Sequence, residues 1–157
     1  MRIISIDPGY ERLGVAVIEK NKNERETLVF SECFKTSNKL PHNERLALIG
    51  DRIIEIIKKY KPERLATEKL FFAGNQKTAM LVAEARGVIL YAGTSKGLRV
   101  FEYRPNEIKI AITGYGSAEK KQMMDMVRKL IKIDSKTNSD DELDAIAIGL
   151  THFAIHR

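Results

Sequence analysis

The order in which strand and helix patterns follow one another constrains the fold of this chain more than any other feature. Three apolar runs come first, at residues 2–7, 13–20 and 27–34, with only short polar segments between them, as in hairpin-connected strands. Helix and strand patterns then alternate: helix 42–61, strand 64–71, helix 75–95, strand 98–103, a short helix after Pro105, a helix to about 132, and a helix over 140–156. This order predicts an α/β fold with a five-stranded mixed sheet flanked by helices on both faces.

The composition is that of a globular protein with an excess of basic side chains. The 157 residues fit one domain, and the net charge of +6 is compatible with a nucleic-acid partner, whose phosphates basic side chains neutralise. No apolar run approaches the roughly 20 residues that span a bilayer, and the start has no signal-peptide pattern. The single cysteine, Cys33, is expected as a small buried hydrophobic residue. We therefore predict a single cytoplasmic domain over residues 1–157.

Two of the predicted strands carry a carboxylate at or near their C-terminal ends. Asp7 closes the first strand directly before Pro8-Gly9, where Asp is also an ordinary turn residue, and Glu68 lies near the end of the fourth strand. If these two strands are parallel neighbours, their carboxyl ends reach the edge of the sheet where open α/β folds bind ligands. Two like charges at that edge would need a positive group between them, and a divalent cation is the simplest such group.

The last helix adds two more carboxylates. Ser139 and Glu142 fit a capping box, and Asp140 suits the positive end of the helix dipole. Neither explanation covers Asp144, which stands among apolar residues where Asp is unfavourable without a partner. Asp141 and Asp144 are three residues apart and therefore share one face of the helix.

The four carboxylates of Asp7, Glu68, Asp141 and Asp144 form a set of hard oxygen donors. No Cys/His cluster with zinc spacing accompanies them in the sequence. Oxygen-only sites suit Mg²⁺, with Mn²⁺ as a substitute, rather than zinc. Two such ions about 4 Å apart can activate a water and stabilise the leaving oxygen during phosphodiester cleavage.

Four segments of the chain resemble the RuvC family of Holliday-junction resolvases. They are "SIDPG", "ATEKLFFAGNQKTAMLVAEARGVIL", "VFEYRPNEIKIAITGYGSAEK" and "DDELDAIAIGLTH", in the order and spacing of the family over nearly the whole chain. The resemblance implies an RNase H-like fold and matches Asp7, Glu68, Asp141 and Asp144 to the family's catalytic, metal-binding acids. The charged pair Glu11-Arg12 stands where family members vary.

The resemblance also implies a function and partners. Members of the family act as homodimers on four-way DNA junctions in recombination and repair, and a branch-migration motor and junction-binding complex works with them. Their paired symmetric nicks leave 5′-phosphate and 3′-hydroxyl ends. This chain is therefore expected to be a Mg²⁺-dependent endodeoxyribonuclease with two metal ions in each active site.

Several further residues are candidate DNA contacts. By resemblance, Phe71 matches an aromatic residue at the junction crossover, although either Phe71 or Phe72 suits base stacking, since adjacent residues point in opposite directions. Asn75 belongs either to this DNA surface or to the cap of the next helix. The remaining candidates are basic residues matched to the phosphate backbone or placed at a helix expected to start near Ser117, where a phosphate can bind: Lys109, Lys120 and Lys121.

Other functions stay open at the level of sequence. A basic RNase H-like domain could bind branched DNA without cutting it, although the intact acids argue against this. An RNase H that cleaves RNA–DNA hybrids would use the same acids. A half-domain of a sugar-kinase or actin-like ATPase would also begin with Asp and Gly, but it needs a second domain that 157 residues do not provide. His152 and His156 are expected on the surface.

Overall fold

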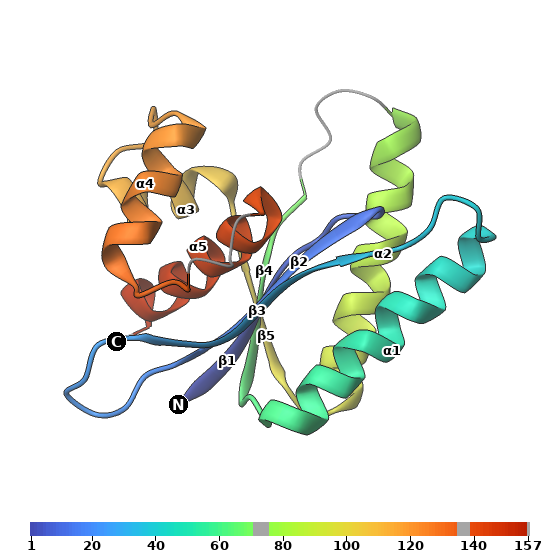
Figure 1. Cartoon of the computed structure of the whole chain (residues 1–157), viewed down its shortest axis with the longest axis horizontal. Coiled ribbons are helices and arrows are strands. Elements are labelled where there is room, and N and C mark those ends of the chain that lie inside the picture. Colours follow the sequence, from blue (N-terminus) through green and yellow to red (C-terminus); the bar gives the residue numbers. More distant parts are fainter. Residues whose placement is uncertain (71–75, 135–138, 157) are drawn as a thin grey trace.

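A computed structural model describes residues 1–70, 76–134 and 139–156. Five strands form one sheet in the order β3-β2-β1-β4-β5, which confirms the predicted mixed sheet (Figure 1). The elements are β1 (Arg2–Asp7), β2 (Arg12–Glu19), β3 (Thr27–Lys35), α1 (His42–Tyr60), β4 (Arg64–Glu68), α2 (Gln76–Ser95), β5 (Arg99–Tyr103), α3 (Pro105–Thr113), α4 (Lys120–Leu130) and α5 (Asp140–Ile155).

The strand pairing brings the two acidic strand ends together as the sequence predicts. β1 pairs antiparallel with β2, and β2 with β3, through short connections. β1 pairs in parallel with β4 on its other side, with Ile6 beside Thr67, so Asp7 and Glu68 are the next residues on adjacent strands. Both carboxylates therefore leave the sheet at the same edge.

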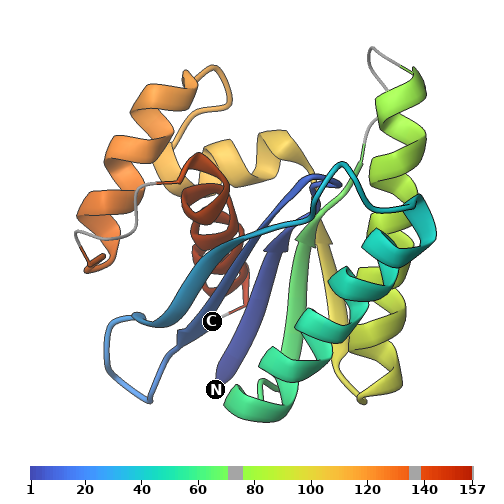
Figure 2. The ribbon, with the colours of Figure 1, turned by 45° about the vertical axis from the view of Figure 1, so that its right-hand side comes forward.

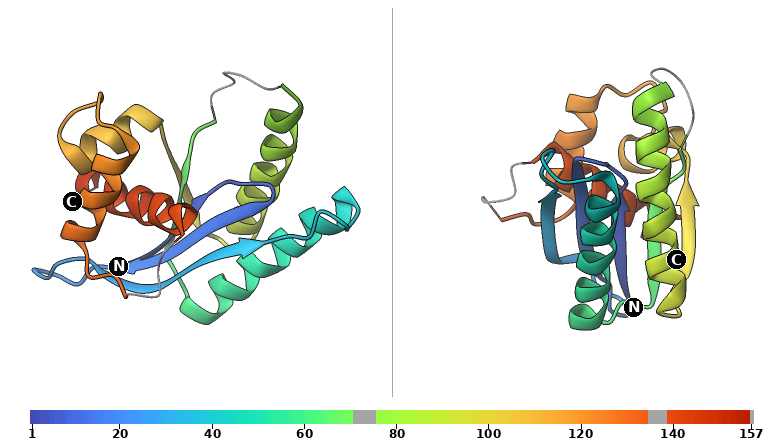
Figure 3. Two further views of the ribbon diagram at one scale, coloured as in Figure 1. Left: turned by 45° about the horizontal axis from the view of Figure 1, so that its top comes forward. Right: turned by 90° about the vertical axis from the view of Figure 1, so that its right-hand side faces the viewer.

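Helices cover both faces of the sheet, as predicted. α1 and α2 lie together on one face, while α3, α4 and α5 lie on the other (Figures 2 and 3). Successive β1 residues alternate between the two cores: Ile3 packs with the α5 side, and Ile4 and Ile6 pack with the α1 side. This two-sided burial explains why β1 is a continuous apolar run rather than an alternating one.

α5 packs closely against β1 and β2 at two glycines. A Cβ on Gly14 of β2 would lie 1.9 Å from the backbone oxygen of Asp141, in the first turn of α5. A Cβ on Gly149 would lie 2.7 Å from both the hydroxyl oxygen of Ser5 and the Cδ1 of Ile18. The helix can sit this low on the sheet because neither position carries a side chain.

Some boundaries differ from the predicted ones. α4 begins at Lys120 rather than near Ser117, because Glu119 takes the N-cap position and forms a capping box with Gln122. β4 ends at Glu68, and α2 begins at Gln76. Within the described residues, we find no helix with the length and apolar character needed to cross a membrane.

Candidate active site

The turn after β1 fixes the direction of Asp7. The Gly9 amide donates to the Asp7 carbonyl over 3.0 Å, which closes a tight turn. A Cβ on Gly9 would lie 1.7 Å from the backbone oxygen of Arg12, so the turn itself requires glycine. The Thr67 hydroxyl donates to the Ile6 carbonyl over 2.9 Å and ties β4 to β1 one residue before both acids. The Asp-Pro-Gly segment is thus a turn and also a rigid support for the Asp7 side chain.

The first turn of α5 brings in the other two acids, but its cap differs from the predicted capping box. Ser139 is the N-cap residue, yet its side chain makes no capping hydrogen bond, and its hydroxyl donates to Asp141 over 3.0 Å. The Glu142 carboxylate accepts from Ser31 of β3 over 2.9 Å. The capping-box prediction is wrong because the Ser139 hydroxyl binds the Asp141 side chain and the Glu142 carboxylate binds Ser31, instead of backbone amides at the helix start. Asp141 and Asp144 each keep 24% of their side-chain surface exposed.

Two basic side chains pair with the α5 acids. The Lys120 ammonium lies 3.2 Å from Asp144 and 3.5 Å from Asp140. Burial lowers the pKa of Lys120, but these two carboxylates outweigh it, so the pKa lies above its ordinary value. On the other side, the Arg12 guanidinium lies 3.0 Å from Asp141. The acids are thus partly neutralised by the protein's own cations.

Mutual repulsion nevertheless remains strong within the acidic set. Burial raises the pKa of Asp7 to about 7, with further increases from the charges of Asp144, Glu68 and Asp141. Burial and the charge of Asp144 also raise the pKa of Glu68. Burial raises the pKa of Asp144 as well, although Lys120 offsets part of the effect. Groups from β1, β4 and α5 therefore share one electrostatic environment, which is the pattern of a functional site.

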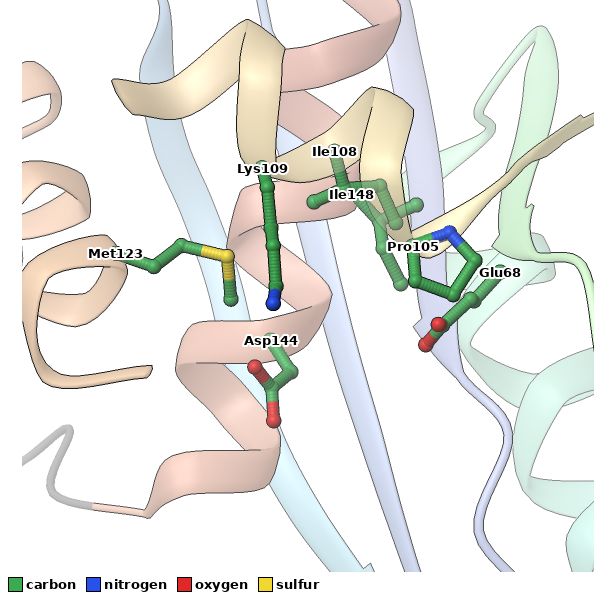
Figure 4. Close-up of a pocket in the computed structure, with 7 residues that line it drawn as sticks. All are labelled: Glu68, Pro105, Ile108, Lys109, Met123, Asp144 and Ile148. Atoms are coloured by element: carbon green, nitrogen blue, oxygen red, sulfur yellow. The ribbon is translucent and has the colours of Figure 1, made fainter. Parts of the chain in front are cut away.

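A pocket of about 160 Å³ opens between the end of β4 and the helices α3, α4 and α5. Glu68 and Asp144 line it, and Figure 4 shows the Lys109 side chain extending from α3 toward Asp144. Its remaining walls are mainly apolar and come from Pro105, Ile108, Met123 and Ile148. Apolar walls around carboxylates exclude water and strengthen their interaction with any cation that enters.

The donor chemistry of the site fits a hard divalent cation. All four candidate ligands are carboxylates, and their repulsion would be relieved by a positive ion. Within residues 1–70, 76–134 and 139–156, no three acidic, histidine or cysteine side chains already surround one point. Lys120 and Arg12 pair with Asp144 and Asp141 in this arrangement, so a metal ion would share or compete for these carboxylates.

The candidate DNA contacts are only partly visible. Lys109 lines the pocket and Lys120 pairs with the α5 acids, whereas Lys121 is exposed in the first turn of α4. Phe71 and Asn75 lie outside the described residues, as does Phe72. The structure thus brings two of the three lysines to the acidic cluster and leaves their roles as predictions.

Three residues near the acids were missed as site residues by the sequence argument. Gly14 lies opposite Asp7 in the β1–β2 ladder and makes room for the backbone of Asp141. Arg12 pairs with Asp141, and the thiol of Cys33 donates to the same carboxylate over 3.5 Å. Cys33 is half-buried and polar in its contacts, so its expected role as a small buried hydrophobic residue is wrong. A glycine inside a strand often marks a site where another backbone approaches closely. Of these three residues, only Gly14 could therefore have been identified from the sequence.

The fold and the site together define a class of protein. A five-stranded mixed sheet with acids at the ends of β1 and β4 and on a helix packed across the sheet is the arrangement of an RNase H-like nuclease. A family model described as "Crossover junction endodeoxyribonuclease RuvC" matches residues 3–152. The chain belongs to this family.

Individual relatives agree with this assignment. The chain is 45% identical to crossover junction endodeoxyribonuclease RuvC of Fusobacterium nucleatum, over 97% of this chain and 80% of the relative. It is also 45% identical to the protein of the same name from Brachyspira hyodysenteriae, over 100% of this chain and 96% of the relative. A solved structure of Thermus thermophilus RuvC in complex with Holliday junction substrate has a TM-score of 0.93 and 33% identity, and the match covers 100% of this chain and 95% of that one.

Proposed function

We propose that this chain is an endonuclease that resolves four-way DNA junctions in recombination and repair through paired symmetric nicks. The observation that carries the proposal is the convergence of Asp7, Glu68, Asp141 and Asp144 at one edge of the sheet, in a member of the crossover junction endodeoxyribonuclease family. The Holliday junction bound by the Thermus thermophilus relative supports the same class of substrate. Residues 1–157 would act as a single nuclease domain.

The four acids would hold two Mg²⁺ ions, with Mn²⁺ as a substitute. When bound, such ions supply an activated water and stabilise charge on the leaving oxygen of a phosphodiester. Asp7 is central to the set, because the charges of the other three acids all act on it. Glu68 enters from β4, and Asp141 and Asp144 from α5, so three rigid elements fix the donors.

Basic residues would hold the DNA beside these acids. The Lys120 ammonium lies 3.2 Å from Asp144, so it would stand beside a phosphate that enters next to this carboxylate. Lys109 lines the pocket that also contains Glu68 and Asp144, and its charge would offset the negative charge that develops during cleavage. Lys121, Phe71 and Asn75 would contact the DNA outside the pocket. The products would carry 5′-phosphate and 3′-hydroxyl ends.

Cleavage of defined substrates tests the proposal. The protein is incubated with a mobile four-way junction, a linear duplex of the same sequence and an RNA–DNA hybrid, with Mg²⁺ or with EDTA. We expect Mg²⁺-dependent paired nicks in the junction alone. Asp7→Asn should still bind the junction but nick at least about 1,000-fold more slowly, since catalysis depends on positioned charge in the transition state. Asp51→Asn, an exposed residue of α1, is the matched control and should cleave normally.

Other results would contradict the proposal in distinct ways. Equal cutting of junction and duplex would exclude selectivity for structure. Junction binding without cutting would identify a binding module, and preferential cutting of the hybrid would identify an RNase H. Normal nicking by the Asp7→Asn variant would remove Asp7 from the metal site.

We also propose that the enzyme is a homodimer that associates through the outer face of α2. Met80 and Tyr91 are 66% and 72% exposed, and with Gly87 they follow the spacing of one helical face. A Cβ on Gly87 would meet nothing within 4 Å, so packing inside this chain does not account for a glycine in mid-helix. Close approach of a second copy would account for both the glycine and the exposed apolar residues.

The dimer is tested by sedimentation of the wild type and of the Met80→Lys/Tyr91→Lys variant. The wild type should sediment as a dimer, and the variant should be a folded monomer that no longer makes paired nicks. Leu48→Lys is the control, because Leu48 is an exposed apolar residue of α1, at 41%. A monomeric wild type, or dissociation by Leu48→Lys alone, would refute this interface.

Two further expectations accompany the proposed activity. A branch-migration motor and junction-binding complex would deliver the junction, as the family resemblance implies. The enzyme would act in the cytoplasm, which holds the chromosome in bacteria such as those that contain the relatives.

A further inference from the structure

The two carboxylate oxygens of Asp141 have different surroundings. The Arg12 Nε lies 3.0 Å from Oδ2, the Ser139 hydroxyl donates to Oδ2 over 3.0 Å, and the Cys33 thiol donates to Oδ2 over 3.5 Å. Within the part of the chain that the structure describes, the hydrogen bonds to Asp141 all end on Oδ2. A carboxylate oxygen offers about two lone-pair sites, so the hydroxyl and the thiol use those of Oδ2 and the Arg12 charge lies beside them, which leaves Oδ1 as the oxygen open to another ligand.

The three donors come from three different elements. Arg12 begins β2, Cys33 lies in β3, and Ser139 is the N-cap of α5. Their convergence therefore depends on the tertiary fold. Ser139 in particular uses its hydroxyl on Asp141 and makes no side-chain capping bond at the helix start, although capping is the usual use of a serine there.

Asp141 lies over a row of three paired residues in the sheet. Asp7 lies opposite Gly14 in the β1–β2 ladder, and Gly14 lies opposite Cys33 in the β2–β3 ladder, so the three residues form one row across the sheet. The backbone of Asp141 lies over Gly14, and its side chain reaches Cys33. The position of Asp141 relative to Asp7 is thus fixed by backbone packing and by the contacts to Oδ2.

We propose that Arg12, Cys33 and Ser139 are positioning residues that hold Asp141 through Oδ2 and leave Oδ1 as its metal-binding atom. This inference rests on the proposed metal-dependent function. Carboxylates that bind metal ions are themselves hydrogen-bonded by outer residues, and loss of such a partner typically weakens metal affinity about 10- to 100-fold. Arg12 also supplies a positive charge beside Asp141, whereas Lys120 pairs with Asp140 and Asp144.

A second role for Arg12 would have the opposite consequence. If Arg12 only neutralised the acids, it would compete with the metal ion, and its removal would tighten metal binding. A positioning role predicts weaker binding after removal. Ser139→Ala and Cys33→Ala separate the two roles further, because each removes a donor to Oδ2 without changing the charge of the site.

Direct binding of Mn²⁺ to the DNA-free protein, followed by electron paramagnetic resonance, tests the inference without relying on cleavage. We expect Arg12→Gln, Ser139→Ala and Cys33→Ala each to raise the dissociation constant about 10-fold. Arg12→Lys should recover part of the loss, since it restores the charge, and Cys33→Ser should bind like the wild type. Arg52→Gln is the matched control, because Arg52 makes a bidentate pair with Glu32 on the opposite face of β3.

The outcomes separate this inference from the proposed function. If Asp141→Asn binds Mn²⁺ like the wild type, the proposed metal site is wrong. If Asp141→Asn loses Mn²⁺ while Ser139→Ala and Arg12→Gln bind normally or more tightly, the metal site stands and the positioning role is overturned. Equal weakening by Arg52→Gln would also overturn it, because the effect would then arise from general loss of stability.

Discussion

The two ends of α5 both bury ionisable groups but treat them differently. At the N-terminal end, Asp144 lies in an acidic cluster whose repulsion contributes to raising the pKa of Asp7 to about 7. At the C-terminal end, His152 is fully buried, its Nδ1 lies 2.7 Å from the Tyr103 hydroxyl, and its Nε2 lies 3.1 Å from Arg64. Burial, with smaller effects from His156 and Arg64, lowers the pKa of His152 to about 4.

The two ends of α5 therefore have different roles, one in stability and the other in function. Neutral His152 satisfies both ring nitrogens, since Nδ1 donates to Tyr103 and Nε2 accepts from Arg64, so this end stabilises the fold. The acidic end keeps like charges close together at a cost in stability. Such unfavourable local electrostatics is expected where a site is arranged for a ligand. Three predictions test this contrast, in order of decreasing effect.

The largest effect is expected from the two glycines under α5. Gly14→Ala should reduce junction cleavage at least about 100-fold, because an added Cβ would displace the backbone of Asp141, and small misplacements of catalytic groups are costly. Gly149→Ala introduces a milder clash, 2.7 Å from side-chain atoms of Ser5 and Ile18, and should cost about 1–3 kcal/mol of unfolding free energy. Its folded fraction should cleave normally. Equal loss of cleavage in both variants would mean that the two ends of α5 are not functionally distinct.

The next effect concerns the stability of the acidic end. In EDTA at pH 8, Asp7→Asn should be more stable than the wild type by about 2–4 kcal/mol, since it removes a buried charge whose pKa is raised from 3.8 to about 7. The raised pKa destabilises the folded wild type progressively as pH rises from 3.8 to 7, so the gain should disappear near pH 4. Urea unfolding at both pH values measures it. A variant less stable than the wild type at pH 8 would show that the cluster is not strained.

The smallest effect is expected at the other end of α5. The pKa of His152 is lower in the folded state, so its contribution to stability is complete above pH 6.5 and is lost as pH falls toward 4. We expect a loss of about 2–3 kcal/mol over this range relative to His152→Asn, which does not titrate. Comparing the two proteins by urea unfolding cancels the acids that titrate in the same range. Parallel pH profiles would place the His152 side chain in contact with solvent.

The sheet could be predicted because each strand is an apolar segment that can be recognised in the sequence by itself. β1 is a continuous apolar run bounded by a turn that needs Gly9, and it was placed at residues 2–7, as observed. The order of elements allowed β1 and β4 to be parallel neighbours, and the structure confirms this pairing, which brings Asp7 and Glu68 to one edge. α5 was also predicted nearly to its ends, since its acidic first turn marks the start.

The contacts around the acids could not be predicted, because a sequence pattern does not show which side chain each polar group will bind in the folded chain. Ser139 was assigned a local cap, but a carboxylate two residues away took its hydroxyl instead. Cys33 looked like a core residue and contacts Asp141 across the sheet. His152 was expected on the surface, and that expectation is wrong because Tyr103 and Arg64 provide polar partners inside the protein. For Cys33 and His152 a tertiary partner replaced the expected environment, and for Ser139 a neighbouring side chain in the same helix did so.

The row formed by Asp7, Gly14 and Cys33 also determines where the chain tolerates a change of length. Because side chains alternate along a strand, one residue inserted between Gly9 and Gly14 would shift the ladder and place a side chain under the first turn of α5. The exposed segment of residues 21–25 joins β2 to β3 far from that row, and it can lengthen without moving either acid. Two connections in one three-stranded unit thus have opposite tolerances, and length variation among natural or engineered versions of this enzyme should collect at the second connection.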